Sequence, residues 1–403
     1  MKKLHAYLLF PALLLFSACS SNTSQSVNQP TGISASSTPS VVPSTPAPPP
    51  DPWESAKLIG SITYAPDGNK IDTDSILQIK FSPNGTLIAS KVLEDKIRIW
   101  DLQTGERKFT IRKGSQRDPK QKAYSIALSN DLIRNISFDY DSNYIIFSIL
   151  GPLISSDGRI CIVEIASPAT QEGETLASCF FKSTGWEIGN GLLWSENPIT
   201  IISGGWAKKI SAWQLEGNQI NDKSKFKELY KTKEYGDLPS MANNTSPQGI
   251  VSELSRSPDK TMFIAAMVQS PAVVFDIKTG AEIVRFGTAS DNISTAKLRN
   301  DIAVLGTESG QVSVWSVANG KALKTIPAHQ DKINSVLVSP DGKYIFSGSS
   351  DKTLKVWNLK SGNLITTFTD CNSSVNTLDM TQDGKILGAG CGNGSIQLWR
   401  IDK

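Results

Sequence analysis

"AHQDKINSVLVSPDGKYIFSGSSDKTLKVWNLKSGNLITTF", residues 328–368, contains four short runs in which apolar and polar residues alternate. The runs are "KINSVLV", "KYIFSG", "TLKVW" and "NLITTF", and a period of two indicates β-strands. Turn signals such as "SPDG" and "KSG" separate the runs. The stretch therefore predicts one four-stranded antiparallel sheet.

The same pattern recurs along the chain. Residues 370–399 align without gaps to 328–357, which lie 42 positions earlier. The equivalents of the aromatic residue in the third run mark seven units, at Trp100, Val163, Trp213, Phe275, Trp315, Trp357 and Trp399. The last unit ends at its third strand, and "AKLIGSITY" (56–64) can supply the fourth. Such pairing closes a ring of sheets and removes open edges.

The repeats resemble the WD-repeat (WD40) β-propeller family over essentially all of 53–403. One repeat has all four residues that the family links by hydrogen bonds: His329, Ser347, Asp351 and Trp357. The resemblance implies an all-β, seven-bladed β-propeller of four-stranded antiparallel blades, closed by an N-terminal strand. Units two and four lack the tryptophan, so six or eight blades remain alternatives.

The N-terminus has the pattern of an export signal. Lys2 and Lys3 precede an apolar run of about 13 residues, too short for a membrane-spanning helix and typical of a signal peptide. "FSAC" (16–19) resembles a bacterial lipobox, although Phe16 stands where the motif prefers Leu. The resemblance implies a signal peptide over 1–18 and lipidation of Cys19; cleavage without lipidation is the alternative.

The segment after Cys19 is rich in Ser, Thr and Pro, and residues 20–50 carry no charge. Such a segment cannot bury enough apolar surface to offset its ordering entropy, so we expect a disordered tether over 19–52. The protein is thus expected to be exported and lipid-anchored at the bacterial outer membrane or in the periplasm. Ser20 favours the outer over the inner membrane, and the choice between them stays open.

The remaining four cysteines are expected to pair, because an exported protein meets an oxidising compartment. Cys161 and Cys179 would face each other if the hairpin between them turns near residue 170. In the alignment of the last two units, Cys371 replaces His329. We therefore expect a Cys371–Cys391 bridge to take the place of the family's histidine link. Free buried thiols are the alternative.

Composition argues against most catalytic classes. The chain has 41 basic and 38 acidic residues, and 39 basic ones remain without the two N-terminal lysines. A nearly neutral body does not fit nucleic-acid binding. Of two histidines, His5 lies in the signal and His329 has a structural role by resemblance. We expect no catalytic residue, cofactor, metal ion or small-molecule substrate. The alternative is an enzyme that uses the central channel, as a metal-dependent hydrolase or a quinone-type oxidoreductase.

In the family, loops from the second to the third strand and from the fourth strand to the next unit share one face, here called the top face. Units one to three enlarge these loops, with a basic loop at 112–124. Aromatic and Arg residues are enriched among binding anchors. The candidate partner-binding residues are Arg112, Lys113, Arg117, Trp186, Trp206 and Tyr235. The alternative is that each Trp packs under its own loop. We expect a non-catalytic scaffold that binds protein partners at the cell envelope.

Overall fold

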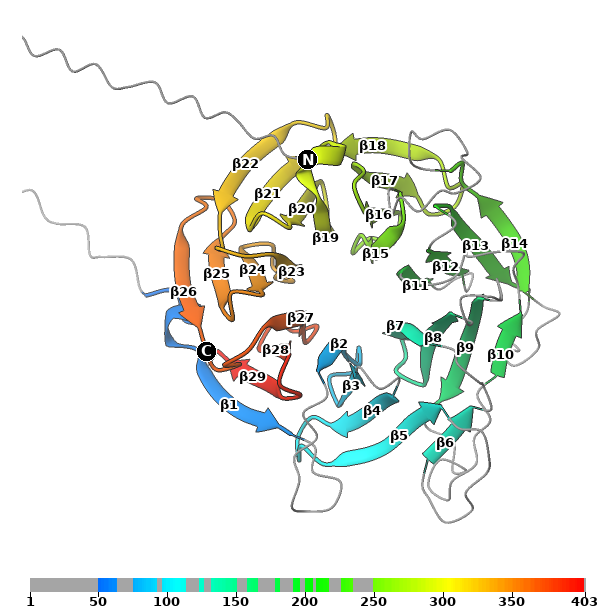
Figure 1. The fold of residues 1–403 in the computed structure, drawn as a ribbon, viewed down its shortest axis with the longest axis horizontal. Helices are drawn as coiled ribbons and strands as arrows, with labels where there is room; N and C mark the ends of the chain where they lie inside the picture. The colour runs from blue at the N-terminus through cyan, green and yellow to red at the C-terminus, as the bar shows by residue number, and fades with distance from the viewer. Residues whose placement is uncertain are drawn as a thin grey trace, which may run out of the picture. The chain divides into compact units, whose positions relative to one another are not determined.

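The computed structural model describes residues 50–63, 75–92, 96–113, 123–126, 132–150, 158–165, 178–181, 191–195, 200–205, 208–216, 226–234 and 249–401. Of the two units into which the chain divides, the second, Pro50–Lys403, is a ring of seven β-sheets (Figure 1). We number the sheets as blades 1 to 7 along the chain. The prediction of a seven-bladed β-propeller is confirmed.

Blades 1 to 6 each consist of strands that follow one another along the chain. The strands of the first three blades are β2 (Ile76–Phe81), β3 (Leu87–Val92), β4 (Lys96–Asp101), β5 (Arg107–Lys113) and β6 (Ala123–Ile126); β7 (Leu132–Phe138), β8 (Tyr144–Leu150), β9 (Gly158–Glu164) and β10 (Ser178–Phe181); β11 (Gly191–Ser195), β12 (Thr200–Gly204), β13 (Ile210–Leu215) and β14 (Phe226–Lys231). Those of the next three are β15 (Val251–Arg256), β16 (Met262–Met267), β17 (Ala272–Asp276) and β18 (Glu282–Phe286); β19 (Ile293–Arg299), β20 (Ile302–Thr307), β21 (Gln311–Ser316) and β22 (Ala322–Pro327); β23 (Ile333–Val338), β24 (Tyr344–Ser349), β25 (Leu354–Asn358) and β26 (Leu364–Phe368). The short helix η3 (Ala289–Asp291) joins blades 4 and 5.

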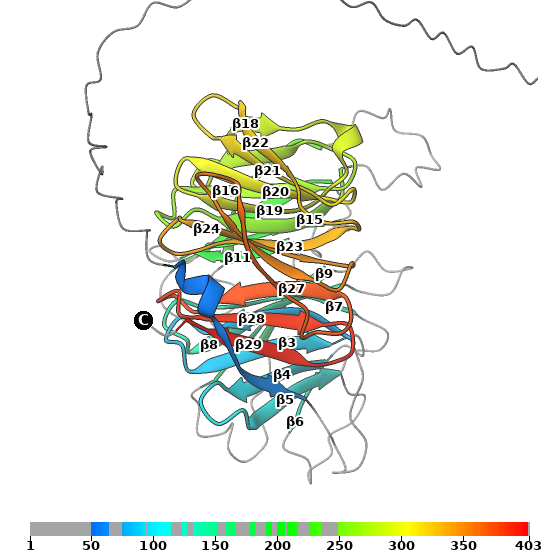
Figure 2. The same cartoon turned by 90° about the vertical axis from the view of Figure 1, so that its left-hand side faces the viewer.

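Blade 7 joins the two ends of the propeller. It contains β27 (Val375–Met380), β28 (Ile386–Cys391) and β29 (Ile396–Arg400), and its fourth strand is β1 (Lys57–Ile62). β1 pairs antiparallel with β29, as predicted, and the two lie side by side in both views (Figures 1 and 2). Because both chain ends share one sheet, opening the ring requires breaking this strand pairing.

A short helix precedes the closing strand and fixes the start of the propeller. η1 (Pro52–Ser55) begins with Asp51, whose side chain accepts a hydrogen bond from the Trp53 backbone N–H at 3.0 Å. Trp53 is 1% exposed and packs edge-on against Phe346 of blade 6 with ring centroids 4.9 Å apart. It belongs to the apolar cluster that blades 6 and 7 share. Sequence analysis gave Trp53 no role.

Blade 1 carries a fifth strand that the sequence analysis did not predict. β6 pairs with β5 in parallel, with Ala123 opposite Thr110 and Ile126 opposite Lys113. The expected loop over 112–124 is therefore wrong at both ends, because Arg112 and Lys113 lie in β5 and β6 begins at Ala123.

The repeat marker of each blade lies in its third strand, between two neighbouring strands of the sheet. Six of the seven markers are buried, and Trp315 is half-buried. Val163 and Phe275, which replace the tryptophan in blades 2 and 4, are both 0% exposed. A smaller apolar residue therefore keeps the buried position although it loses the indole N–H, which explains why the repeat continues through the two irregular units.

Candidate functional site

The first strand of every blade lies next to the central channel (Figure 1). In six described first strands the register shifts at one residue, which is a β-bulge near the top face: Leu77, Arg134, Ser252, Ser294, Asn334 and Asn376. Several of these residues link one blade to the next. Asn334 Nδ2 donates to the Val375 carbonyl at 3.1 Å, and Asn376 Nδ2 donates to the Ile76 carbonyl at 2.9 Å.

The residue after the bulge forms a second tier of links in five of these six blades. Its side-chain oxygen accepts the backbone N–H of the next blade's first strand, as Ser335 Oγ accepts from Leu378 at 3.1 Å. The same relation joins five blade seams: Gln78 with Ile136, Glu253 with Ala296, Thr295 with Val336, Ser335 with Leu378, and Thr377 with Ile79. Backbone donors at the inner sheet edges thus have partners. These polar side chains stabilise the ring.

Glu253 is the one charged residue among these five acceptors. Its carboxylate accepts hydrogen bonds from Thr295 Oγ1 and the Ala296 N–H, and it forms an ion pair with Lys297. Burial raises the pKa of Glu253, but Lys297 and the hydrogen bonds outweigh it and hold the pKa below its usual value. A carboxylate already occupied in this way is a poor general base. Its geometry indicates a structural link between blades 4 and 5.

The four residues that the sequence analysis singled out in blade 6 form one chain of hydrogen bonds. His329 Nε2 lies 2.7 Å from Ser347 Oγ, and His329 Nδ1 lies 2.8 Å from Asp351 Oδ2. Trp357 Nε1 donates to Ser347 Oγ at 2.9 Å. Together they connect the loop before β23, the strand β24, the following turn and β25.

A neutral imidazole gives every donor and acceptor in this series of hydrogen bonds a partner. Nδ1–H donates to Asp351, and Nε2 accepts from Ser347, whose oxygen accepts from Trp357. A second ring proton would remove the acceptor of the Ser347 hydroxyl. Burial lowers the pKa of His329 below its ordinary value, and the Asp351 charge only partly opposes this effect. His329 is therefore neutral near pH 7 and serves as a structural link.

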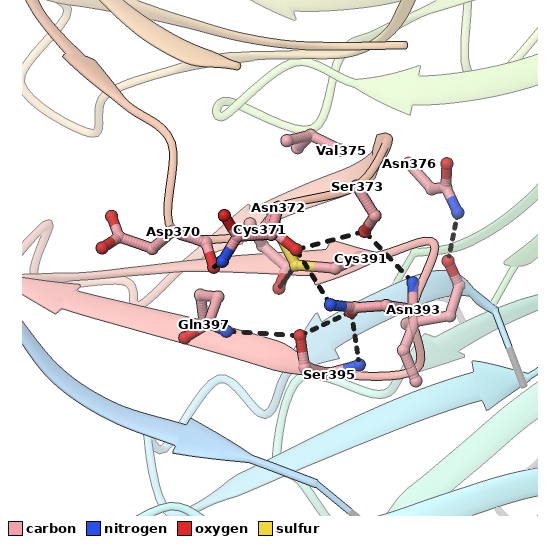
Figure 3. The surroundings of a disulfide bond; sticks show 12 residues. Asp370, Cys371, Asn372, Ser373, Val375, Asn376, Cys391, Asn393, Ser395 and Gln397 are labelled. Carbon is pink, nitrogen blue, oxygen red and sulfur yellow. Dashed lines mark hydrogen bonds between the residues drawn. A yellow bond between two sulfur atoms is a disulfide. The ribbon is translucent and has the colours of Figure 1, made fainter. Parts of the chain in front are cut away.

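Blade 7 replaces this chain by a covalent link (Figure 3). A disulfide joins Cys371 and Cys391, whose Cα atoms are 5.6 Å apart. Asn393, the counterpart of Asp351, donates from Nδ2 to the Cys371 carbonyl at 2.9 Å. The disulfide thus connects the loop before β27 to the end of β28, as His329 and Asp351 connect the same places in blade 6.

The other cysteine pair lies in blade 2. The pairing of β9 with β10 sets Cys179 opposite Cys161, and Cys161 is disulfide-bonded. Cys19 lies outside the described residues.

Most of the predicted partner-binding residues also fall outside the described part of the chain, namely Arg117, Trp186, Trp206 and Tyr235. Arg112 and Lys113 lie in β5 and not in a loop. Within the described ranges, no group of three or more His, Cys, Asp or Glu side chains could hold a metal ion, and no helix is long and apolar enough to cross a membrane. The described residues that the structure brings together near the top face are the bulge residues that join neighbouring blades and the links within blades 6 and 7.

Sequence analysis missed the two tiers of channel hydrogen bonds. Their members are Ser, Thr, Asn, Gln and Glu residues, which recur every 40 to 42 positions through blades 4 to 7, and each donor–acceptor pair crosses a blade seam. In every first strand except that of blade 3, a polar residue lies two positions after a β-branched residue at or next to the strand's start, as Ser335 follows Ile333.

Comparison with known proteins agrees with this geometry. The model of the family "WD domain, G-beta repeat" (WD40) matches residues 320–358 and 362–400. Eukaryotic translation initiation factor 3 subunit I of Sclerotinia sclerotiorum is 21% identical over 317 residues, covering 72% of this chain and 81% of that protein. The guanine nucleotide-binding protein subunit beta of Zea mays is 29% identical over 128 residues, covering 29% of this chain and 34% of that protein.

The fold defines the class of this protein as a seven-bladed β-propeller, and residues 320–358 and 362–400 are similar to WD40 repeats.

Proposed function

We propose that this chain is a non-catalytic protein-interaction scaffold, exported as a lipoprotein and tethered at the bacterial cell envelope. The proposal rests on one observation: in both blade 6 and blade 7, a side-chain link holds the top-face loop that precedes the first strand. Blade 6 links its leading loop to its turn through His329 and Asp351, and blade 7 links the same places through Cys371–Cys391. Rigidly held loops present a binding surface of fixed geometry at low entropic cost.

The relatives support the same function, because both are named as subunits of larger assemblies. The side-chain chemistry agrees with it, since Glu253 beside the channel and His329 at the top face are both engaged in structural hydrogen bonds. A disulfide in blade 7 suits an oxidising compartment outside the cytosol. The basic start, the apolar run and Cys19 support export and anchoring.

Recovery of partners from solubilised envelope tests the scaffold. The tagged protein should retain specific proteins, and the double variant Trp186→Ala/Trp206→Ala should retain at least about tenfold less, as removing anchor aromatics costs ~1.4 kcal/mol or more. Leu323→Ala is the matched control, because Leu323 is 57% exposed on the outer strand β22. Equal recovery by the double variant and the control would show that these tryptophans are not the anchors.

Membrane fractionation of Cys19→Ser tests the tether separately. A single acyl chain gives weak membrane binding and stable anchoring takes more, so loss of all lipid at Cys19 should release the protein. A variant that stays with the membrane would refute lipidation of Cys19 as the anchor.

A further inference from the structure

A cavity lies at the other end of the channel, on the face opposite the top face, here called the bottom face. The cavity, of about 360 Å³, opens where the first strands end. Phe138, Arg256, Arg299 and Val338 are the last residues of β7, β15, β19 and β23, and all four line it. The described wall comes from blades 1, 2, 4, 5, 6 and 7.

The charge of this wall is strongly one-sided. Its basic members are Arg256, Lys260, Lys297 and Arg299, whereas Asp139 is its acidic member. The Asp139 carboxylate accepts the Tyr144 N–H at 2.7 Å, and burial raises the pKa of Asp139. Lys297 is neutralised by Glu253. Three carboxylates of the neighbouring turns accept backbone N–H groups within their own turns, namely Asp259, Asp341 and Asp383.

Arg299 has a buried side-chain donor that lacks a hydrogen-bond partner in the described part of the chain. This donor is Nε, and no ion pair among the described residues includes Arg299. Burial lowers the pKa of the Arg299 guanidinium, and the charge of Asp341 only partly opposes this. Buried donors normally have partners because an unsatisfied one costs ~1–3 kcal/mol. An incoming anion would supply compensating charge next to this group.

Lys260 adds a second cation at an unusual backbone position. Its φ is 61°, in the left-handed region, where the same turn of blades 1, 6 and 7 has Gly85, Gly342 and Gly384. A side chain in this conformation costs roughly 1–2 kcal/mol. The Lys260 ammonium lies 4.3 Å from the centre of the Tyr140 ring of blade 2, so it extends across the cavity mouth. Lysine thus occupies a position at which glycine fits the backbone better.

We propose that this bottom cavity binds an acidic segment of a protein partner, whose carboxylates contact Arg299 and Lys260. The inference rests on the proposed scaffold function and names a second docking surface for it. Apolar wall residues favour a peptide, because they offer contact for its aliphatic groups: Pro83, Pro258, Leu298, Leu337 and Val338. Charge complementarity of this kind selects partners and speeds their association.

A capped hexaglutamate peptide is the direct probe, with hexaglutamine as the neutral control. Isothermal calorimetry at about 50 mM salt should show binding of hexaglutamate that weakens as salt is raised, because exposed charges are screened. Arg299→Gln and Lys260→Gly should each weaken it by about tenfold, which corresponds to ~1.4 kcal/mol. Lys260→Gly also relieves the left-handed backbone, so the variant should fold at least as well as the wild type.

The matched control is Lys385→Gln, an exposed lysine in the same turn of blade 7 that does not line the cavity. It should bind hexaglutamate as the wild type does. Wild-type protein that does not bind hexaglutamate, or binding unchanged in both cavity variants, would overturn the proposal. Inorganic pyrophosphate that binds more tightly than hexaglutamate would also overturn it, since the site would then be a phosphate site.

The proposed scaffold function fails in a different way. Partner recovery from the envelope that is intact in Arg299→Gln and Lys260→Gly, together with absent hexaglutamate binding, would remove the bottom site and leave the scaffold standing. Absence of any specific partner of the wild-type protein would instead remove the scaffold.

Discussion

The disulfide of blade 7 allows a quantitative prediction. We replace both cysteines, Cys371→Ala with Cys391→Ala, so that no unpaired thiol remains. The bond closes a loop between residues 20 positions apart. In the chain-entropy model such a loop stabilises the folded state by about 3 kcal/mol. Both cysteines are at most 1% exposed, so substitution removes the bond more cleanly than added reductant does.

The change in melting temperature follows from the size of the propeller. At ~2.1 cal/mol/K per residue, unfolding of Pro50–Lys403 has an entropy of roughly 0.7 kcal/mol/K. A loss of about 3 kcal/mol therefore lowers the melting temperature by about 4 °C. Differential scanning calorimetry of the two proteins at equal pH measures this shift. The Asn393 hydrogen bond to the Cys371 carbonyl should keep the native fold in the variant.

Reductant added to the double variant is the control, because it reports the contribution of the disulfide at Cys161 alone. A melting temperature within about 1 °C of the wild type would refute the reasoning, because a loop of this length would then stabilise by well under the chain-entropy value.

Three further predictions concern the links around this site. His329→Gln should lower the free energy of unfolding by about 2 kcal/mol. Because the pKa of His329 is lowered in the folded state, that state binds fewer protons, and wild-type stability should fall as pH drops below ~6.5. The variant should lack this contribution to the pH dependence, which urea titrations between about pH 5.5 and 7.5 would show. A wild type and variant with parallel pH profiles would contradict this. Gly310→Ala should be severely destabilising, since its φ is +81° and a Cβ would lie 2.2 Å from the His329 carbonyl oxygen. Gly342→Ala is the control: its φ is +72° with open space around it, so it should cost only about 1 kcal/mol, measured for both variants by thermal unfolding. Trp53→Ala should cost about 3–5 kcal/mol through the cavity between blades 6 and 7, and a melting temperature unchanged in that variant would show that η1 does not anchor the ring.

The repeat determined how much of the fold was predictable. Seven markers, 40 to 63 positions apart, predicted the blade count, because each occupies the same place in a third strand. The missing last strand pointed to β1. Alignment of Cys371 with His329 pointed to the disulfide, because the two residues hold the same place in neighbouring blades.

Three of the features that were not predicted from the sequence lack this periodicity. β6 is a four-residue strand that pairs in parallel, and no repeat predicts it. Trp53 stands alone beside a Pro-rich segment, so only the folded ring shows that it packs against Phe346. The bottom cavity combines residues from first strands and turns of six blades, and the left-handed backbone of Lys260 is a property of the folded turn.

Chemical crosslinking in intact cells that make the protein tests most directly the central claim, that the protein is a tethered interaction scaffold. Mass spectrometry of the products should show a few specific proteins joined to reproducible positions of the propeller, and these crosslinks should be lost with Cys19→Ser if anchoring brings the partners within reach. Crosslinks that merely follow the abundance of envelope proteins, scattered over the whole surface, would contradict the account.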